Sequence, residues 1–211
     1  QQQDFEGIFE VMKGFPVTIR FLDPPLHEFL PKEEEDIVEL AGEMGINVET
    51  LKAKIEDLHE FNPMLGHRGC RLAVTYPEIA IMQTRAVIKA ALAVGEDTVP
   101  EIMIPLTSHV NELRRQREVL EAEARDVMDE QGVEVSYQFG TMIEVVRACM
   151  RADSLAGDAD FFSFGTNDLT QATFSFSRED AENKFLPMYN RIGILKDNPF
   201  EVLDVKGVGK L

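Results

Sequence analysis

The stretch DFFSFGTNDLT, residues 160–170, joins a short apolar run to a glycine turn and a polar ending. Three other apolar runs stand along the chain: PVTIRFLD at 16–23, EIMIPL at 101–106 and FGTMIEV at 139–145. The segment GCRLAV at 69–74 is a further candidate. Short apolar runs bounded by turn residues predict buried strands, and near-continuous apolar strands are typical of parallel sheets.

Helical segments alternate with these runs. Residues 77–94 place apolar side chains at helical spacing, and residues 109–130 are rich in Glu, Arg, Leu and Ala, which favour helices. This alternation predicts one α/β domain, a barrel or a doubly wound sheet, whose parallel strands are joined by right-handed crossovers. One insertion interrupts it, because residues 31–61 have the apolar spacing of a helical hairpin that turns near Gly45.

The charge balance excludes several classes of function. A formal net charge of −17 argues against binding to nucleic acid, since clustered Lys and Arg drive that binding. No run reaches the roughly 18 apolar residues of a membrane span, and the first residues do not resemble a signal peptide. We therefore expect a cytoplasmic protein without a membrane partner. Cys70 and Cys149 are too few for a disulfide framework, and both are expected to be reduced.

Polar side chains stand where three of the predicted strands end. Arg20 follows VTI, Glu144 follows TMI, and Asn167 and Asp168 follow FFSFGT. The carboxyl ends of parallel strands converge on one face, so these side chains are expected to surround a ligand, although each alone could equally cap a turn or form an ion pair. If Glu144 and Asp168 converge, they would suit Mg²⁺ together with substrate oxygens and water. Arg20, with Arg68, would then bind a carboxylate or phosphate in two-point contact.

A resemblance to a known family rests on six stretches: PVTIRFLDPPLHEFLP, NPMLGHRGCRL, YPEIA, EIMIPL, GTMIEV and FFSFGTNDLTQ. In this order they resemble the C-terminal phosphoenolpyruvate/pyruvate-binding barrel of the pyruvate, phosphate dikinases. FGTNDLTQ is shared across the wider phosphoenolpyruvate-utilising enzyme family, whereas DPPLHEFLP and the hairpin before GHRGCR indicate the dikinase branch. The resemblance implies that residues 1–211 form part of a (β/α)8 TIM-type barrel, with about five of its eight strands and the hairpin inserted.

The resemblance also implies a function. Enzymes of this family interconvert ATP, pyruvate and phosphate with AMP, phosphoenolpyruvate and pyrophosphate, and the barrel interconverts phosphoenolpyruvate and pyruvate through an enolate. This chain would bind phosphoenolpyruvate or pyruvate with Mg²⁺ and would be inactive alone. Its implied partners are the phosphohistidine and nucleotide-binding domains of the same parent chain and a second copy in a homodimer.

The family's site residues can be carried over where the motifs match. Arg20 and Arg68 would be the catalytic arginines that hold the phosphate and carboxylate of the substrate. Glu144 and Asp168 would bind Mg²⁺, and their spacing of 24 positions suits one helix and the next strand. The substrate-binding loop would be completed by Gly165, Thr166 and Asn167.

Other parts of the family's pattern are expected outside this stretch. Two strands with another substrate arginine should precede Gln1. A strand with the Cys-Gly-Glu-His loop, whose cysteine is the family's proton donor, should follow Leu211. Cys149, in the helical pattern RACMRA, is not expected to replace that cysteine. Arg178 could either help to hold phosphate or begin a surface helix.

Two alternatives to this interpretation stay open at this point. The first is a fragment of a phosphoenolpyruvate synthase, which uses water where the dikinase uses phosphate. The second is a non-catalytic binding module.

Overall fold

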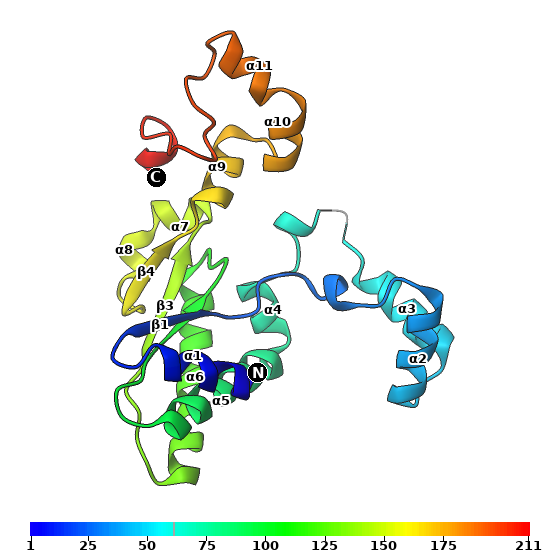
Figure 1. Cartoon of the computed structure of the whole chain (residues 1–211), viewed down its shortest axis with the longest axis vertical. Helices are drawn as coiled ribbons and strands as arrows, with labels where there is room; N and C mark the ends of the chain where they lie inside the picture. Colours follow the sequence, from blue (N-terminus) through cyan, green and yellow to red (C-terminus); the bar gives the residue numbers. More distant parts are fainter. Residues whose placement is uncertain (61) are drawn as a thin grey trace.

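A four-stranded parallel sheet forms the centre of the computed structural model, which describes residues 1–60 and 62–211. Its strand order is β1-β2-β3-β4, and the strands are Pro16–Arg20, Val99–Ile104, Gln138–Ile143 and Phe161–Phe164. The prediction of parallel pairing between these four apolar runs is confirmed. The sheet is curved like part of a barrel wall (Figure 1).

Helices α1 (Gln2–Val11), α5 (Pro77–Val94) and α6 (Val110–Gln131) pack in sequence beside the sheet, α1 on α5 and α5 on α6. The last two match the helices predicted from periodicity. The main core joins buried side chains of the strands to those of the helices, among them Ile19, Ile102, Phe139, Val87, Ala91, Leu113 and Leu120. These helices cover one face of the sheet and leave its carboxyl edge uncovered. The polar side chains at that edge can therefore form a site.

The prediction of a strand at 69–74 was wrong, because Cys70–Thr75 is helix α4. Gly69 has a φ of 55°, a left-handed conformation that turns the chain before the segment can extend. The Cys70 N–H then bonds to the Pro105 carbonyl at 2.9 Å, which ties the start of α4 to the loop after β2. The described residues therefore contain four strands and not about five.

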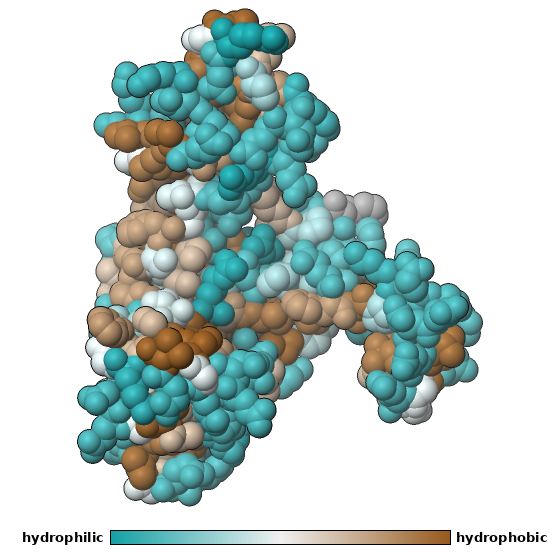
Figure 2. Space-filling model, in the orientation of Figure 1, coloured by the Kyte–Doolittle hydropathy of each residue, from teal (hydrophilic) through white to brown (hydrophobic). Residues whose placement is uncertain are grey.

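Two helices, α2 (Glu34–Met44) and α3 (Val48–Leu58), stand where the hairpin was expected. Gly45 ends α2 with a φ of 65°, and the Asn47 side chain caps α3 by accepting a hydrogen bond from Glu49 N–H. The pair has its own small core of Ile37, Ala41 and Leu51. It projects away from the main body, with apolar side chains visible among the hydrophilic ones (Figures 1 and 2). The expected end of the insertion, at residue 61, lies outside the described residues.

Short helices complete the chain around the carboxyl edge of the sheet. They are the 3-10 helices Leu26–Phe29 (η1), Pro63–Leu65 (η2) and Val208–Lys210 (η3) and the α-helices Val146–Met150 (α7), Ala152–Leu155 (α8), Thr166–Phe174 (α9), Arg178–Lys184 (α10) and Leu186–Arg191 (α11). Within residues 1–60 and 62–211, no helix has both the length and the hydrophobicity needed to cross a membrane.

The contact between β3 and β4 depends on Gly140. A Cβ at this position would lie 2.5 Å from the Phe161 carbonyl oxygen, so Gly140→Ala forces backbone apart and should lower the free energy of unfolding by about 1 to 3 kcal/mol. Gly7→Ala is the control, since a Cβ at Gly7 in α1 meets nothing within 4 Å. That control should be neutral or stabilising by up to about 1 kcal/mol. Urea denaturation measures both, and a wild-type midpoint for Gly140→Ala would contradict the close approach.

Candidate active site

The carboxyl ends of the strands open onto a pocket of about 1140 Å³. Four of the side chains predicted from the sequence lie in its wall, namely Arg68, Glu144, Asn167 and Asp168, and three further arginines join them, Arg71, Arg147 and Arg178. Arg20, Gly165 and Thr166 are not part of this wall, but Arg20 and Gly165 each contact residues close to it. The pocket therefore gathers cationic groups and carboxylates from an otherwise strongly acidic chain.

Glu144 directly follows β3 and is only 3% exposed. Its Oε1 accepts a hydrogen bond of 2.8 Å from the Leu106 N–H, which orients the carboxylate. Gly165 allows the loop after β4 to pass close by, because a Cβ there would lie 2.5 Å from the Glu144 Cβ. The end of β3 and the loop after β4 thus enclose one carboxylate between them.

The loop that presents the Leu106 N–H is fixed from two sides. The Thr141 hydroxyl donates to the Ile104 carbonyl at 2.7 Å and is 2.8 Å from the Thr107 hydroxyl, and both threonines are fully buried. The Cys70 N–H bonds to the carbonyl of Pro105, the residue before Leu106. Leu106 itself has a φ of 58°, an unusual conformation for a residue with a branched side chain. Such strain persists where the surrounding contacts enforce it.

Burial raises the pKa of the Glu144 carboxyl to about 8. A hydrogen bond with Asp168 and the charges of Asp168 and Asp23 contribute to this raised pKa, and the hydrogen bond from the Leu106 N–H opposes them. Two carboxylates that share a site in this way repel each other when both are ionised, and a divalent cation between them removes the repulsion. Glu144 and Asp168 are therefore the side chains suited to hold a hard cation.

The described part of the chain has no group of three or more His, Cys, Asp or Glu side chains arranged to hold a metal ion. A cation at Glu144 and Asp168 would therefore rely on other oxygen ligands, such as water and substrate. This is the coordination that Mg²⁺ commonly adopts, with one or two carboxylates and several water or phosphate oxygens.

Asp23 is a site residue that the sequence reasoning missed. Its Oδ2 lies 2.6 Å from Arg68 Nη2 and 3.2 Å from Arg20 Nη1, so one carboxylate oxygen joins both predicted arginines. Asp23 is 6% exposed, whereas Arg20 is largely open to solvent. In the sequence, Asp23 is the last residue of an apolar run. A carboxylate at a strand end is the same signal that singled out Glu144, and it could have identified Asp23 too.

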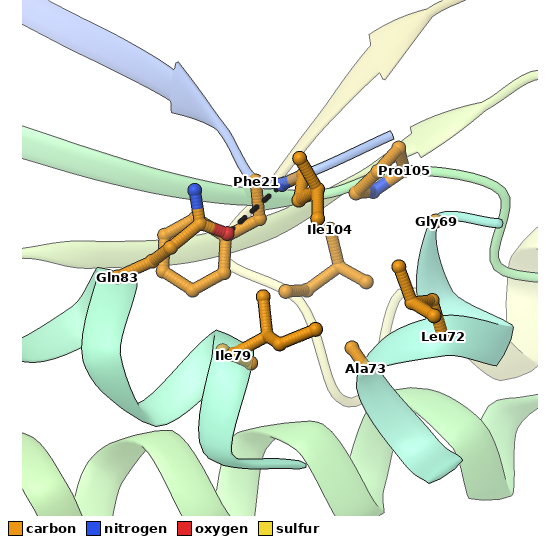
Figure 3. A pocket seen from close by; sticks show the side chains of 10 residues that line it. Phe21, Gly69, Leu72, Ala73, Ile79, Gln83, Ile104 and Pro105 are labelled. Carbon is orange, nitrogen blue, oxygen red and sulfur yellow. Dashed lines mark hydrogen bonds between the residues drawn. The ribbon is translucent and has the colours of Figure 1, made fainter. Parts of the chain in front are cut away.

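A small apolar cavity lies behind the segment that leads to Asp23 (Figure 3). It has a volume of about 10 Å³, which is too small for any ligand larger than water. The Gln83 side chain of α5 beside it accepts a 2.9 Å hydrogen bond from the Leu22 N–H, drawn as a dashed line in Figure 3. The Gly69 N–H bonds to the Asp23 carbonyl at 3.0 Å. This cavity belongs to the packing that supports the site.

Arg178 begins a helix, as one of its two considered roles requires, and it also lies in the pocket wall, while its contact with phosphate stays a prediction. It begins α10 after Ser177, whose side chain accepts a hydrogen bond from the Asp180 N–H. Its guanidinium also lines the pocket, with Nη1 3.3 Å from Asn167 Oδ1 and Nε 3.2 Å from Glu182 Oε2. Arg178 therefore links α10 to the Asn167 side chain of α9.

Neither cysteine is prepared to act as a thiolate nucleophile. Cys70 is fully buried in α4, and burial raises the pKa of its thiol to about 12. Cys149 lies in α7, where burial also raises the pKa of its thiol. Both thiols therefore stay protonated near neutral pH, and neither cysteine is among the residues that line the pocket.

Glu144 should make the stability of the metal-free chain depend on pH. Its carboxyl has a pKa of about 8 in the folded state against an ordinary value of 4.5, so unfolding between these pH values releases a proton. The free energy of unfolding should therefore fall as the pH rises from about 4.5 to about 8. Glu144→Gln cannot titrate and should remove this part of the fall. Urea denaturation across that range checks it, and the same pH dependence in both proteins would show that the Glu144 pKa is not raised.

Comparison with known proteins places the chain in a family. A family model described as "PEP-utilising enzyme, PEP-binding domain" matches residues 1–210. The chain is 54% identical over 215 residues to the pyruvate, phosphate dikinase of Clostridium symbiosum, covering 100% of this chain and 24% of that protein. The Rhizobium meliloti (strain 1021) enzyme gives the same values. Pyruvate, phosphate dikinase 1, chloroplastic, of Arabidopsis thaliana is 54% identical over 216 residues, 100% of this chain and 22% of that protein. The chain spans about a quarter of the length of these relatives, and it belongs to the PEP-utilising enzymes, whose PEP-binding domain it carries.

Proposed function

We propose that this chain is the substrate-binding part of a pyruvate, phosphate dikinase, and that its pocket binds phosphoenolpyruvate or pyruvate together with Mg²⁺. The observation that carries the proposal is that a pair of arginines and a pair of acidic residues lie close together. The arginine pair Arg20 and Arg68 is joined through Asp23, and Asp23 is close enough to the acidic pair Glu144 and Asp168 for its charge to raise the Glu144 pKa.

The charge of this group favours a cation as part of the substrate complex. When all are ionised, two arginines face three carboxylates, those of Asp23, Glu144 and Asp168, so the group is negative without a metal. These carboxylates would repel an anionic substrate, whereas Arg71, Arg147 and Arg178 elsewhere in the pocket wall would attract it. Mg²⁺ held by Glu144 and Asp168 would reverse the sign, and when bound it supplies positive charge to a substrate oxygen that gains negative charge in the reaction.

The two arginines are suited to different tasks. Arg68 is nearly buried, with contacts from Nε to the Asp23 carbonyl and from Nη1 to the Met64 carbonyl at 3.4 Å each, so its guanidinium is oriented before a substrate arrives. The Arg20 side chain is 47% exposed, so an entering anion can reach it. A guanidinium binds a phosphate or carboxylate at two points, which orients the substrate as well as attracting it.

The loop after β4 would complete the substrate site. Thr166 and Asn167 form the first turn of α9, where free backbone N–H groups favour an anion. Gly165 lets this turn approach Glu144, and Arg178 holds the Asn167 side chain at the pocket wall. We propose that Gly165, Thr166 and Asn167 contact the substrate.

The larger context is also part of the proposal. The curved sheet would be one part of a (β/α)8 barrel that other strands of the parent protein complete, and the chain would be inactive alone. Its partners would be the phosphohistidine and nucleotide-binding domains of that parent and a second copy in a homodimer. A cytoplasmic location stays a prediction, since the Arabidopsis relative is chloroplastic by name. The names of the relatives favour the dikinase over the synthase as the parent enzyme.

The metal and arginine roles should separate in mutant kinetics of the full-length protein that contains this chain. Glu144→Gln and Asp168→Asn keep the shape of the side chain and remove a charge, so the Mg²⁺ concentration for half-maximal rate should rise. Removing a residue that only supports a metal ligand costs roughly 10- to 100-fold in metal affinity, and the loss of a direct ligand should exceed this. Arg20→Lys keeps the charge and loses the two-point contact, so the KM for phosphoenolpyruvate should rise while the Mg²⁺ dependence is kept.

Glu123→Gln is the matched control for these amide variants. Glu123 pairs with Arg85 at 2.6 Å on the helical side of the molecule and has no contact with the pocket. It should leave both dependences unchanged. Near wild-type activity in Glu144→Gln or Asp168→Asn would reject the metal site, and a changed Mg²⁺ dependence in Arg20→Lys would reject the separation of roles.

A further inference from the structure

We infer that Asp23 is a positioning residue, whose carboxylate holds the guanidinium groups of Arg20 and Arg68 in the orientation that receives an anionic substrate. The inference rests on the proposed function of the pocket. It starts from the shared contact, in which Asp23 Oδ2 is 2.6 Å from Arg68 Nη2 and 3.2 Å from Arg20 Nη1. The same oxygen thus limits the position of both cations.

Like charges brought this close need a counterion. Two guanidinium groups that contact one oxygen repel each other, and the repulsion is stronger near Arg68 because little water surrounds it. Without the Asp23 charge, the exposed side chain of Arg20 would be free to swing into solvent. The pair would then lose the common orientation that a two-point grip on the substrate requires.

Asp23 is itself rigidly placed. The backbone before it is held by hydrogen bonds from Phe21 N–H to the Met103 carbonyl at 3.0 Å and from Leu22 N–H to Gln83 at 2.9 Å. Its own carbonyl accepts the Gly69 N–H at 3.0 Å. Figure 3 shows how Gln83, Gly69 and Pro105 surround this segment from three elements. The Asp23 backbone is therefore held in place, and its carboxylate contacts both arginines from that position.

The second oxygen of Asp23 indicates more than a structural ion pair. Among the described residues, the buried Oδ1 accepts no hydrogen bond. A buried carboxylate oxygen without a donor destabilises the folded chain, and a residue chosen for stability alone would not leave it so. A water molecule that enters with the substrate would satisfy it. An acceptor without a donor is expected of a residue whose hydrogen bonds are completed only when the substrate is bound.

Asp23→Asn separates positioning from simple charge. The amide removes a negative charge, which by electrostatics alone should tighten the binding of phosphoenolpyruvate. Positioning predicts the opposite: in the full-length protein, kcat/KM for phosphoenolpyruvate should fall by about 10- to 100-fold, mainly through KM. Asp23→Glu, which restores the charge, should recover part of the loss. Asp23→Ser repeats the test with a second uncharged side chain, so that the result does not depend on the folding of one variant.

A double-mutant cycle tests whether Asp23 acts through Arg20. If it does, Asp23→Asn should lower kcat/KM by a smaller factor in the Arg20→Lys background. The loss of kcat/KM in the double variant should then be smaller than the product of the two single losses by a factor of about 3 or more. Asp158→Asn is the control, because Asp158 binds Arg114 at 3.0 Å outside the pocket. It should leave KM unchanged and should combine independently with Arg20→Lys.

The outcomes distinguish a failure of this inference from a failure of the proposed function on which it rests. Wild-type protein that neither binds nor turns over phosphoenolpyruvate would overturn the proposed function and the inference with it. Wild-type protein that works, with Asp23→Asn or Asp23→Ser folded and at unchanged or lowered KM, would overturn the positioning role alone. Losses that multiply independently in the cycle would also overturn it.

Discussion

The burial of the Glu144 carboxylate is the constraint on which the rest of the site depends. Burial of an ionised carboxylate next to a second acid destabilises the folded chain. Glu144 has Asp168 as that neighbour, and the Leu106 N–H is the backbone donor that stabilises its carboxylate. The strained conformation of Leu106 and the buried Thr141 hydroxyl both serve to aim that donor. The result is a Glu144 carboxyl with a raised pKa next to Asp168, the pair that we propose as the ligands of a divalent cation.

The same edge of the sheet brings opposite charge to this pair. The short segment after β1 carries Asp23 to the point where α4 begins, and Arg68 precedes that helix by two positions. Packing of Gly69 against the loop after β2 sets the distance between these elements, since a Cβ there would lie 3.0 Å from the Leu106 Cβ. Asp23 and Arg68 are therefore placed by one junction of three loops, and the loop after β2 also donates the Leu106 N–H to Glu144.

Much of this could be predicted from the sequence, for physical reasons. The four strands follow from apolar runs, and the meeting of Glu144 and Asp168 in one pocket follows from parallel pairing, which brings strand ends to one edge. Arg20 lies outside the pocket wall and is linked to it through Asp23. The ion pair of Asp23 with Arg68 could not be predicted from local pattern, because the two residues are 45 positions apart. GCRLAV likewise suits a strand or a helix, and its contact with Pro105 made the difference.

The most direct test of the account is a crystal structure of the protein with phosphoenolpyruvate and Mn²⁺, which replaces Mg²⁺ and gives an anomalous signal. The account predicts a peak within about 2.3 Å of oxygens from both Glu144 and Asp168, with the substrate anion reaching Arg20 and Arg68. A metal bound elsewhere, or a substrate held in the pocket without contact to either arginine, would contradict it.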